Sequence, residues 1–217
     1  MPRKKSSRSG TEERRKTILS AALQCFSEYG IENTTVQDIQ LIAKCSTGSL
    51  YHHFGNKEGI AACLFIETLE SMNAGVLAEL QHCNDARTGV HVVVTQICQW
   101  MSDNTSAARF LLQSRDIQFP PDKRAELKHK YAETMRGYFQ WFTPFVEDGS
   151  MKSLPLDTYV PLISGPVQEY TRRWLARQVD RTPASLNSVF SDAAWNAVRG
   201  DVGLSTLSRN TDNPGEY

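Results

Sequence analysis

The clearest chemistry in this sequence lies in a run of small polar side chains followed by longer hydrogen-bond donors. The small residues are Ser46, Thr47, Gly48 and Ser49, and the longer donors are Tyr51, His52, His53 and Lys57. At the first turn of a helix, small polar residues let the backbone approach the phosphates and base edges of a DNA major groove. Longer donors can then bind the phosphates on either side of the groove. The pattern predicts a helix that reads double-stranded DNA.

Three helices are needed to position these side chains, and apolar spacing and capping predict the first two. From Thr11 to Tyr29, apolar residues recur at spacings of three and four, which indicates an amphipathic helix that ends at Gly30. Thr35 followed by Asp38 is a capping-box pattern. We therefore expect a short second helix to begin after Thr35.

The third helix is the predicted DNA reader itself. Ser46 can cap its N-terminus, Leu50 and Phe54 provide its buried side, and Gly55-Asn56 ends it. Two short helices joined by a tight turn, after a longer first helix, are typical of the helix-turn-helix motif.

The distribution of charge favours a nucleic-acid module at the N-terminal end. The chain carries 24 Lys and Arg residues and 24 Asp and Glu residues, so net charge alone favours no partner. Residues 1–16, however, contain seven basic residues and two acidic ones. Such asymmetry is typical of a DNA-binding module joined to another domain, although a solvated basic tail has the same composition. We expect residues 1–10 to form a flexible basic arm and residues 11–57 the helix-turn-helix domain.

Other classes of function find little support in the sequence. It contains no G-x-S-x-G motif, phosphate-binding glycine loop or dinucleotide fingerprint, so we expect neither an enzyme nor a cofactor. The histidines lack metal-ligand spacing, so we expect no metal site. No apolar run approaches the roughly 18–20 residues of a membrane span, and the N-terminus lacks the apolar core of a signal peptide. These features predict a cytoplasmic protein with no membrane partner.

The cysteines leave two interpretations open. They are Cys25, Cys45, Cys63, Cys83 and Cys98. Their odd number and the lack of a C-x-x-C pair favour reduced thiols. Cys63, Cys83 and Cys98 could sense oxidants or electrophiles if the pKa of one were lowered, and buried inert thiols would show the same sequence.

The N-terminal region resembles the signature of the TetR family of bacterial transcriptional repressors. The residues that carry the resemblance are Ile18, Ala22, Phe26, Gly30, Thr34 to Ile39, Ser46 to Phe54, Lys57 and Glu58. The resemblance implies that Thr35 caps the second helix beside a phosphate and that Thr47 and Gly48 approach bases or backbone. It also implies that Tyr51, His52, His53 and Lys57 hold phosphates.

The chain departs from this family pattern in the turn of the motif. Family members usually carry Ala where this chain has Gln40, and a Gly-Val pair where it has Lys44-Cys45. A residue other than glycine at the turn must accept a left-handed or otherwise strained backbone at some energetic cost. Lys44 could compensate by contacting a phosphate, or it could be a solvated turn lysine.

The remainder of the chain has helical patterning, so we predict an all-α fold. By the resemblance, residues 58–202 form a helical effector-binding and dimerisation domain; the polar composition of residues 203–217 predicts a disordered tail. Aromatic residues could line an effector pocket or form plain core: Trp100, Phe110, Tyr138, Trp141 and Phe142. A candidate dimer interface has helical spacing that ordinary core helices would share: Val160, Ile163, Val167, Tyr170, Trp174, Phe190 and Ala194.

The resulting hypothesis is a homodimeric repressor that binds a palindromic DNA operator and is released by an unidentified small-molecule effector. One alternative is a repressor that senses oxidants or electrophiles through a cysteine. Another is a dimeric DNA-binding protein that needs no ligand.

Overall fold

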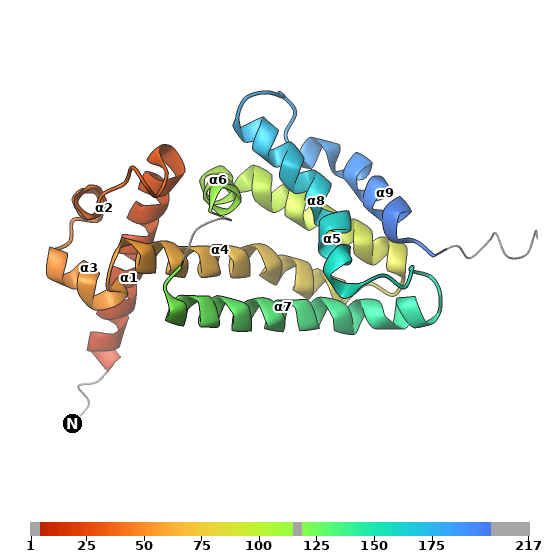
Figure 1. The fold of residues 1–217 in the computed structure, drawn as a ribbon, viewed down its shortest axis with the longest axis horizontal. Coiled ribbons are helices and arrows are strands. Elements are labelled where there is room, and N and C mark those ends of the chain that lie inside the picture. The colour runs from red at the N-terminus through yellow and green to blue at the C-terminus, as the bar shows by residue number, and fades with distance from the viewer. Residues whose placement is uncertain (1–4, 115–118, 201–217) are drawn as a thin grey trace, which may run out of the picture. The chain divides into compact units, whose positions relative to one another are not determined.

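The computed structural model describes residues 5–114 and 119–200, and for residues 5–9 it describes the backbone only. The described residues form α-helices, one 3-10 turn and loops, with an isolated backbone bridge between Met151 and Arg199 and no strand (Figure 1). The expected all-α class is confirmed. The chain divides into two compact units, which we call the first unit (described residues of Met1–Asn73 and Met101–Thr134) and the second unit (Ala74–Trp100 and the described residues of Met135–Tyr217).

The first unit is built on the three N-terminal helices. They are α1 (Lys5–Tyr29), α2 (Val36–Ala43) and α3 (Thr47–Phe54), and they are joined by most of α4 (Lys57–Leu80), by α6 (Thr105–Gln113) and by the first half of α7 (Pro121–Glu147). Their apolar faces share one core, in which Ile18, Ile39, Leu50 and Ile60 are completely buried. The Phe26 ring stacks on that of Phe110 with a centroid distance of 5.8 Å. This core holds α2 and α3 by one side and leaves their other side in solvent.

The second unit contains the remaining helices. They are the end of α4, most of α5 (Ala86–Asp103), the end of α7, α8 (Leu156–Leu175), the 3-10 turn η1 (Ala184–Leu186) and α9 (Asn187–Val198). Gly89 of α5 lies directly against the Trp141 ring, since a Cβ placed on this glycine would approach Trp141 Cη2 to 1.7 Å. The Trp141 indole N–H donates to the Cys83 carbonyl oxygen at 3.3 Å. The close approach of α5 and α7 therefore depends on a residue without a side chain.

Two expected boundaries differ from the structure. The first helix begins at Lys5 and not at Thr11, so part of the expected arm over residues 1–10 is helical, while residues 1–4 lie outside the described range. Lys and Arg are good helix formers, and a single Gly10 within the helix costs only about 1 kcal/mol. The two compact units also do not follow the expected boundary after residue 57, because α6 and half of α7 pack with α1–α3. The expected tail over residues 203–217 lies outside the described residues.

Within the described residues, α4 is the one helix whose length and composition would suit a membrane span. More than half of its most apolar stretch is buried inside the protein. Ile60, Val76 and Leu80 are at most 1% exposed and pack against neighbouring helices. These properties identify α4 as a core helix.

Candidate nucleic-acid interface

The start of α2 is built by the capping box that the sequence predicts. The Thr35 hydroxyl accepts from the Asp38 backbone N–H at 3.2 Å, and Asp38 Oδ2 accepts from the Thr35 backbone N–H at 2.8 Å. The Thr35 hydroxyl also donates to Asp38 Oδ2 at 2.7 Å. The hydrogen bond from the Thr35 hydroxyl, with a smaller effect from the Thr35 backbone N–H, stabilises the Asp38 carboxylate and lowers its pKa. Thr35 is thereby held in an exposed position at the N-terminus of α2.

The turn between α2 and α3 has the backbone that the sequence departure predicts. Lys44 adopts φ 49° and ψ 48°, in the left-handed region, and its N–H donates to the Gln40 carbonyl oxygen. The expectation that a non-glycine residue must accept this conformation is confirmed. For a residue with a Cβ, the left-handed conformation costs roughly 1–2 kcal/mol. The Lys44 side chain itself is exposed.

The side chain of Gln40, the other departure from the family pattern, also carries an energetic cost. Its amide Nε2 is buried without a hydrogen-bond partner. An unsatisfied buried donor costs about 1–3 kcal/mol. The turn of this motif therefore tolerates two local costs, one at Gln40 and one at Lys44.

The third helix presents its N-terminus and one face to solvent. Ser46 caps it, because its hydroxyl accepts from the Ser49 N–H at 3.3 Å, and the exposed Thr47 follows. The space around Gly48 is open, with no atom within 4 Å of a Cβ placed there. Leu50 and Phe54 are buried as predicted. The first turn of α3 thus has the small, accessible surface that close approach to a DNA groove requires.

The longer donors of α3 lie on its exposed side. Tyr51 is 49% exposed, His52 is exposed and His53 is half-buried, with the two histidine rings 5.5 Å apart. The structure therefore brings these three residues together with the capped start of α3, on the surface where the sequence predicts phosphate contacts.

Lys57 is placed differently from the other predicted phosphate ligands. Its ammonium donates to three backbone carbonyl oxygens, at 2.7 Å to Ile31, 3.3 Å to Glu32 and 2.8 Å to Thr34. An ammonium has three N–H donors, so these bonds engage all of them. In this structure the group ties the segment between α1 and α2 to the first residue of α4.

Arg15 supports the same module, and the local sequence pattern does not indicate this role. Its guanidinium forms an ion pair with Glu67 of α4 and lies over the Phe54 ring of α3, 5.8 Å from the centroid. Partial burial lowers the pKa of Arg15, but the hydrogen bond and the charge of Glu67 outweigh it, so that the pKa is raised. Arg15 was one of the basic residues counted in the N-terminal charge excess, yet it connects three helices of the first unit.

The aromatic residues proposed as an effector pocket do not form one group. Phe110 packs on Phe26 in the first unit, whereas Tyr138, Trp141 and Phe142 pack together in the second. Tyr138 and Phe142 are buried, and burial raises the pKa of Tyr138 strongly. These side chains form core, because aromatic rings on the inner side of amphipathic helices pack against whichever helix covers them.

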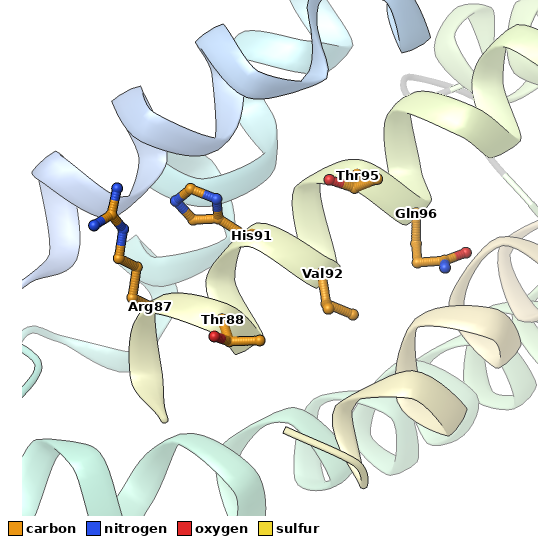
Figure 2. Close-up of a pocket in the computed structure, with 6 residues that line it drawn as sticks. All are labelled: Arg87, Thr88, His91, Val92, Thr95 and Gln96. Carbon is orange, nitrogen blue, oxygen red and sulfur yellow. The ribbon is translucent and has the colours of Figure 1, made fainter. Parts of the chain in front are cut away.

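An open pocket of about 430 Å³ lies instead along α5 in the second unit. It is lined by Arg87, Thr88, His91, Val92, Thr95 and Gln96 (Figure 2). None of the aromatic residues proposed from the sequence lines it. The polar residues at spacings of three and four were the available signal, but the same pattern is typical of any solvated helix face.

The residues of the candidate dimer interface lie on α8 and α9. Ile163, Val167 and Ala194 are 4%, 0% and 1% exposed within a single chain. The rings of Tyr170 and Phe190 contact each other with a centroid distance of 5.2 Å. This seam is where α8 and α9 pack within one protomer. An apolar helical repeat indicates that a face is buried, and it does not distinguish a second chain from the same one.

The three-helix arrangement and the exposed, capped start of α3 are those of a helix-turn-helix DNA-binding domain. Residues 18–63 match the family model described as "Bacterial regulatory proteins, tetR family". This segment therefore carries the DNA-binding domain of the TetR family, as its N-terminal signature predicts.

Relatives with established names are also regulators. The chain is 51% identical over 49 residues to the regulator HbdR of Aromatoleum, an alignment that covers 23% of this chain and 21% of HbdR. It is 28% identical over 149 residues to the repressor KstR2 of Rhodococcus jostii, covering 67% of this chain and 71% of KstR2. A repressor of Mycobacterium tuberculosis is 38% identical over 61 residues, 33% of its length. The chain thus aligns with a third or less of HbdR and of the mycobacterial repressor.

Solved structures share the fold over most of the chain. A TetR family regulator from Marinobacter aquaeolei has a TM-score of 0.74 and 18% identity, covering 89% of this chain and 99% of the other. FadR from Bacillus subtilis, solved in complex with stearoyl-CoA, has a TM-score of 0.69 and 20% identity, covering 82% and 96%. At these identities the likeness concerns the fold alone.

Proposed function

We propose that this protein is a cytoplasmic transcriptional repressor that binds a palindromic operator as a homodimer and leaves it when a small-molecule effector binds. The observation that carries the proposal is the exposed first turn of α3, where Ser46 caps the helix and Thr47 and Gly48 face open solvent. The repressor names of KstR2 and of the mycobacterial relative support the sign of regulation.

Selection of DNA sites from a random pool by the purified protein tests the DNA-binding part. We expect a palindrome whose half-sites are about one helical turn apart. Thr47→Ala should change the preferred bases, because this residue lies at the start of α3. Thr105→Ala, which removes an exposed threonine from the first turn of α6, is the matched control. Recovery of no motif, or an equal effect of the two substitutions, would contradict the assignment.

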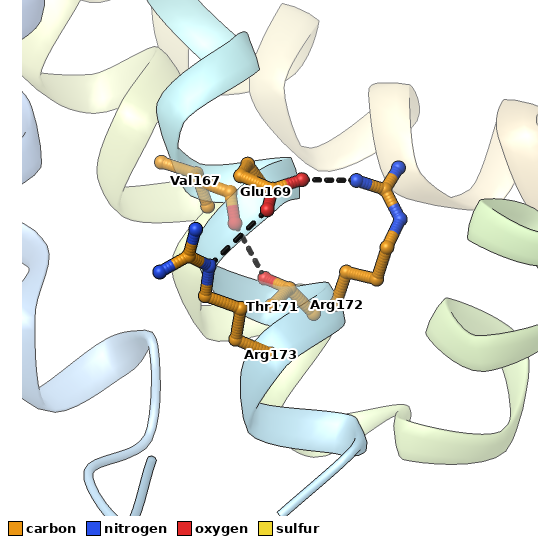
Figure 3. A network of polar contacts seen from close by, with 5 residues as sticks. All are labelled: Val167, Glu169, Thr171, Arg172 and Arg173. Atoms are coloured by element: carbon orange, nitrogen blue, oxygen red, sulfur yellow. Dashed lines mark hydrogen bonds and ion pairs between the residues drawn. The ribbon is translucent and has the colours of Figure 1, made fainter. Parts of the chain in front are cut away.

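A homodimer would use the side of α8 and α9 that a single chain leaves exposed. Leu162 is 36% and Val189 is 59% exposed. On α8, Glu169 forms ion pairs with Arg172 and Arg173, and the Thr171 hydroxyl donates to the Val167 carbonyl oxygen (Figure 3). Apolar residues flanked by ordered charged residues are typical of an interface core with a polar rim.

Sedimentation analysis can distinguish this surface from other exposed apolar positions. We expect Leu162→Arg or Val189→Arg to convert a dimer to a monomer and to abolish binding to the palindrome while each half-site reader stays folded. Leu156→Arg, at an exposed leucine in the first turn of α8, is the control. A dimer that persists with both Leu162→Arg and Val189→Arg would show that the two chains meet elsewhere.

The effector would occupy the pocket along α5 and would carry an anionic group. Arg87 and His91 both line this pocket (Figure 2). Arg87 Nη2 and His91 Nε2 each lie 3.5 Å from the same oxygen of Asp192, and His91 Nε2 is buried without a hydrogen bond. The Asp192 carboxylate is therefore the shared and distant partner of both Arg87 and His91. A carboxylate or phosphate of a ligand could approach these two side chains more closely. The stearoyl-CoA bound to FadR is a precedent for an anionic ligand in this fold.

Thermal-shift measurements with paired probes test the chemical class. Decanoate should raise the melting temperature by mass action, and decanol, which has the same chain without the charge, should not. Arg87→Ala should remove the effect, whereas Arg136→Ala, at an exposed arginine of α7, should retain it. Equal stabilisation by decanoate and decanol would contradict an anionic site. If several anionic and neutral probes all fail both to stabilise the protein and to release DNA, the ligand-independent alternative is favoured.

A further inference from the structure

Lys57 is the residue of the predicted interface whose surroundings do not suit a phosphate ligand. Its Nζ lies within 2.7–3.3 Å of the carbonyl oxygens of Ile31, Glu32 and Thr34, from 23 to 26 residues earlier in the chain. We infer that Lys57 is a positioning residue: it orders the segment between α1 and α2, and through that segment it places Thr35 and α2 for DNA binding. The inference rests on the proposed DNA-binding function.

The segment that Lys57 holds has few hydrogen bonds of its own. It begins at Gly30, with φ 80°, and leads directly to the cap of α2. Within it, the Thr34 N–H donates to the Ile31 carbonyl oxygen at 3.3 Å and the Thr34 hydroxyl to the Gly30 carbonyl oxygen at 2.7 Å. Carbonyl oxygens outside regular structure need partners, and bonds from a charged donor are the stronger kind. The ammonium therefore supplies three charged hydrogen bonds that connect this segment to the first residue of α4.

The position of Lys57 in α4 gives these bonds a consequence for α2. Lys57 is the first residue of α4, so its backbone is fixed by a helix whose next turns contribute the buried Ile60 and Leu64 to the first-unit core. Thr34 is itself 1% exposed, and Thr35 follows it immediately as the N-cap of α2. Loss of the ammonium would release the entry to α2 from the rigid start of α4.

Three lysine variants separate a positioning role from a phosphate contact. Lys57→Met keeps the aliphatic stem and removes the donors, and Lys57→Arg keeps the charge but has a planar fork that cannot point to three convergent carbonyls. Lys128→Met, at an exposed lysine of α7, measures the background. Each variant is assayed for operator affinity, for the slope of log K against log salt, and for amide hydrogen exchange at residues 31–38 in the absence of DNA.

A positioning role predicts that Lys57→Met and Lys57→Arg both lose about tenfold or more in operator affinity while the salt slope stays that of the wild type. Both should also exchange the amides of residues 31–38 faster than Lys128→Met does. A phosphate contact predicts instead that Lys57→Met makes the slope shallower by about one per protomer and that Lys57→Arg retains affinity. That pattern, or unchanged exchange in both Lys57 variants, would overturn the inference.

The exchange measurement keeps this test separate from the proposed function. If the wild-type protein selects no operator, the DNA-binding proposal fails, and faster exchange at residues 31–38 in Lys57→Arg still decides whether the ammonium orders the segment. If Lys57→Met does not fold, Lys57→Arg carries the comparison alone.

Discussion

Replacing Lys44 with glycine should stabilise the protein, although it removes a side chain from the middle of the DNA-binding motif. Lys44 has φ 49° and ψ 48°, a conformation that costs a residue with a Cβ roughly 1–2 kcal/mol and costs glycine almost nothing. Glycine also gives the unfolded chain more freedom, which offsets about 0.4–1 kcal/mol. Because the Lys44 side chain is exposed, its removal leaves no cavity. The expected net gain is therefore about 0.5–1 kcal/mol, or roughly 1–4 °C in melting temperature for a chain of this size.

Lys44→Ala is the matched comparison for this change. It removes the same charge and most of the same side chain but keeps a Cβ in the left-handed conformation. Thermal or urea unfolding should rank Lys44→Gly as the most stable of the three proteins, with Lys44→Ala close to the wild type. If Lys44→Gly is no more stable than Lys44→Ala, the turn is not strained and the reasoning is refuted.

The same pair of variants tests the DNA contact of Lys44. If its ammonium neutralises a phosphate, both variants should lower operator affinity and make the salt slope shallower by about one per protomer. A solvated turn lysine would leave the slope unchanged in both. The stability and the DNA readouts are independent, because one concerns the backbone and the other the side chain.

Three further outcomes follow from contacts of single residues. Gly89→Ala should lower the free energy of unfolding by about 1–3 kcal/mol, because its new methyl group would overlap the Trp141 ring. The melting temperature should fall accordingly. Thr35→Ala should destabilise α2 by about 0.5–2 kcal/mol in denaturant titrations. Thr35 lowers the pKa of Asp38, so the ionised Asp38 contributes fully to folding stability above its ordinary pKa of 3.8. This contribution is lost as pH falls through the lower pKa of the folded state. Thr35→Ala should weaken this dependence of stability on acid pH. Burial raises the pKa of the Cys98 thiol to about 12, so iodoacetamide at pH 8 should not label it in the folded protein, as peptide mass spectrometry can show.

Controls for these outcomes are available in the same chain. Gly165→Ala introduces a methyl group into α8 where no atom lies within 4 Å, so it should be neutral or slightly stabilising. A loss of stability equal to that of Gly89→Ala would mean that the Trp141 contact is not the cause. Cys45, which is half-buried in the turn before α3, should be labelled faster than Cys98. Equal labelling rates would contradict the burial argument.

Features of the DNA-binding motif that depend on neighbouring residues could be predicted from the sequence. The capping box joins residues three apart, the Ser46 cap reaches Ser49, and the left-handed turn is a property of Lys44 itself. The inner side of α3 followed from helical spacing, which placed Leu50 and Phe54 in the core. In each case the physical cause acts within one turn of helix.

Packing partners could not be predicted in the same way. Periodicity showed that Val167 lies on a buried face, and in the folded chain that face is already buried within a single protomer. Phe110 and Phe142 are both buried aromatic residues of α-helices, and they belong to different units. The hydrophobic effect is not directional, so an apolar face carries no information about which apolar face will cover it.

Lys57 and Arg15 show the same division for charged residues. Both are basic residues of a DNA-binding module, and composition alone assigns both to the electrostatic footprint on DNA. The folded chain brings Lys57 to carbonyl oxygens 23–26 residues away and Arg15 to a carboxylate 52 residues away. The helices and their caps follow from interactions between residues that are close in the sequence, and the family follows from the resemblance of the N-terminal motif. The role of each charge depends on contacts between distant residues, which exist only once the helices have packed.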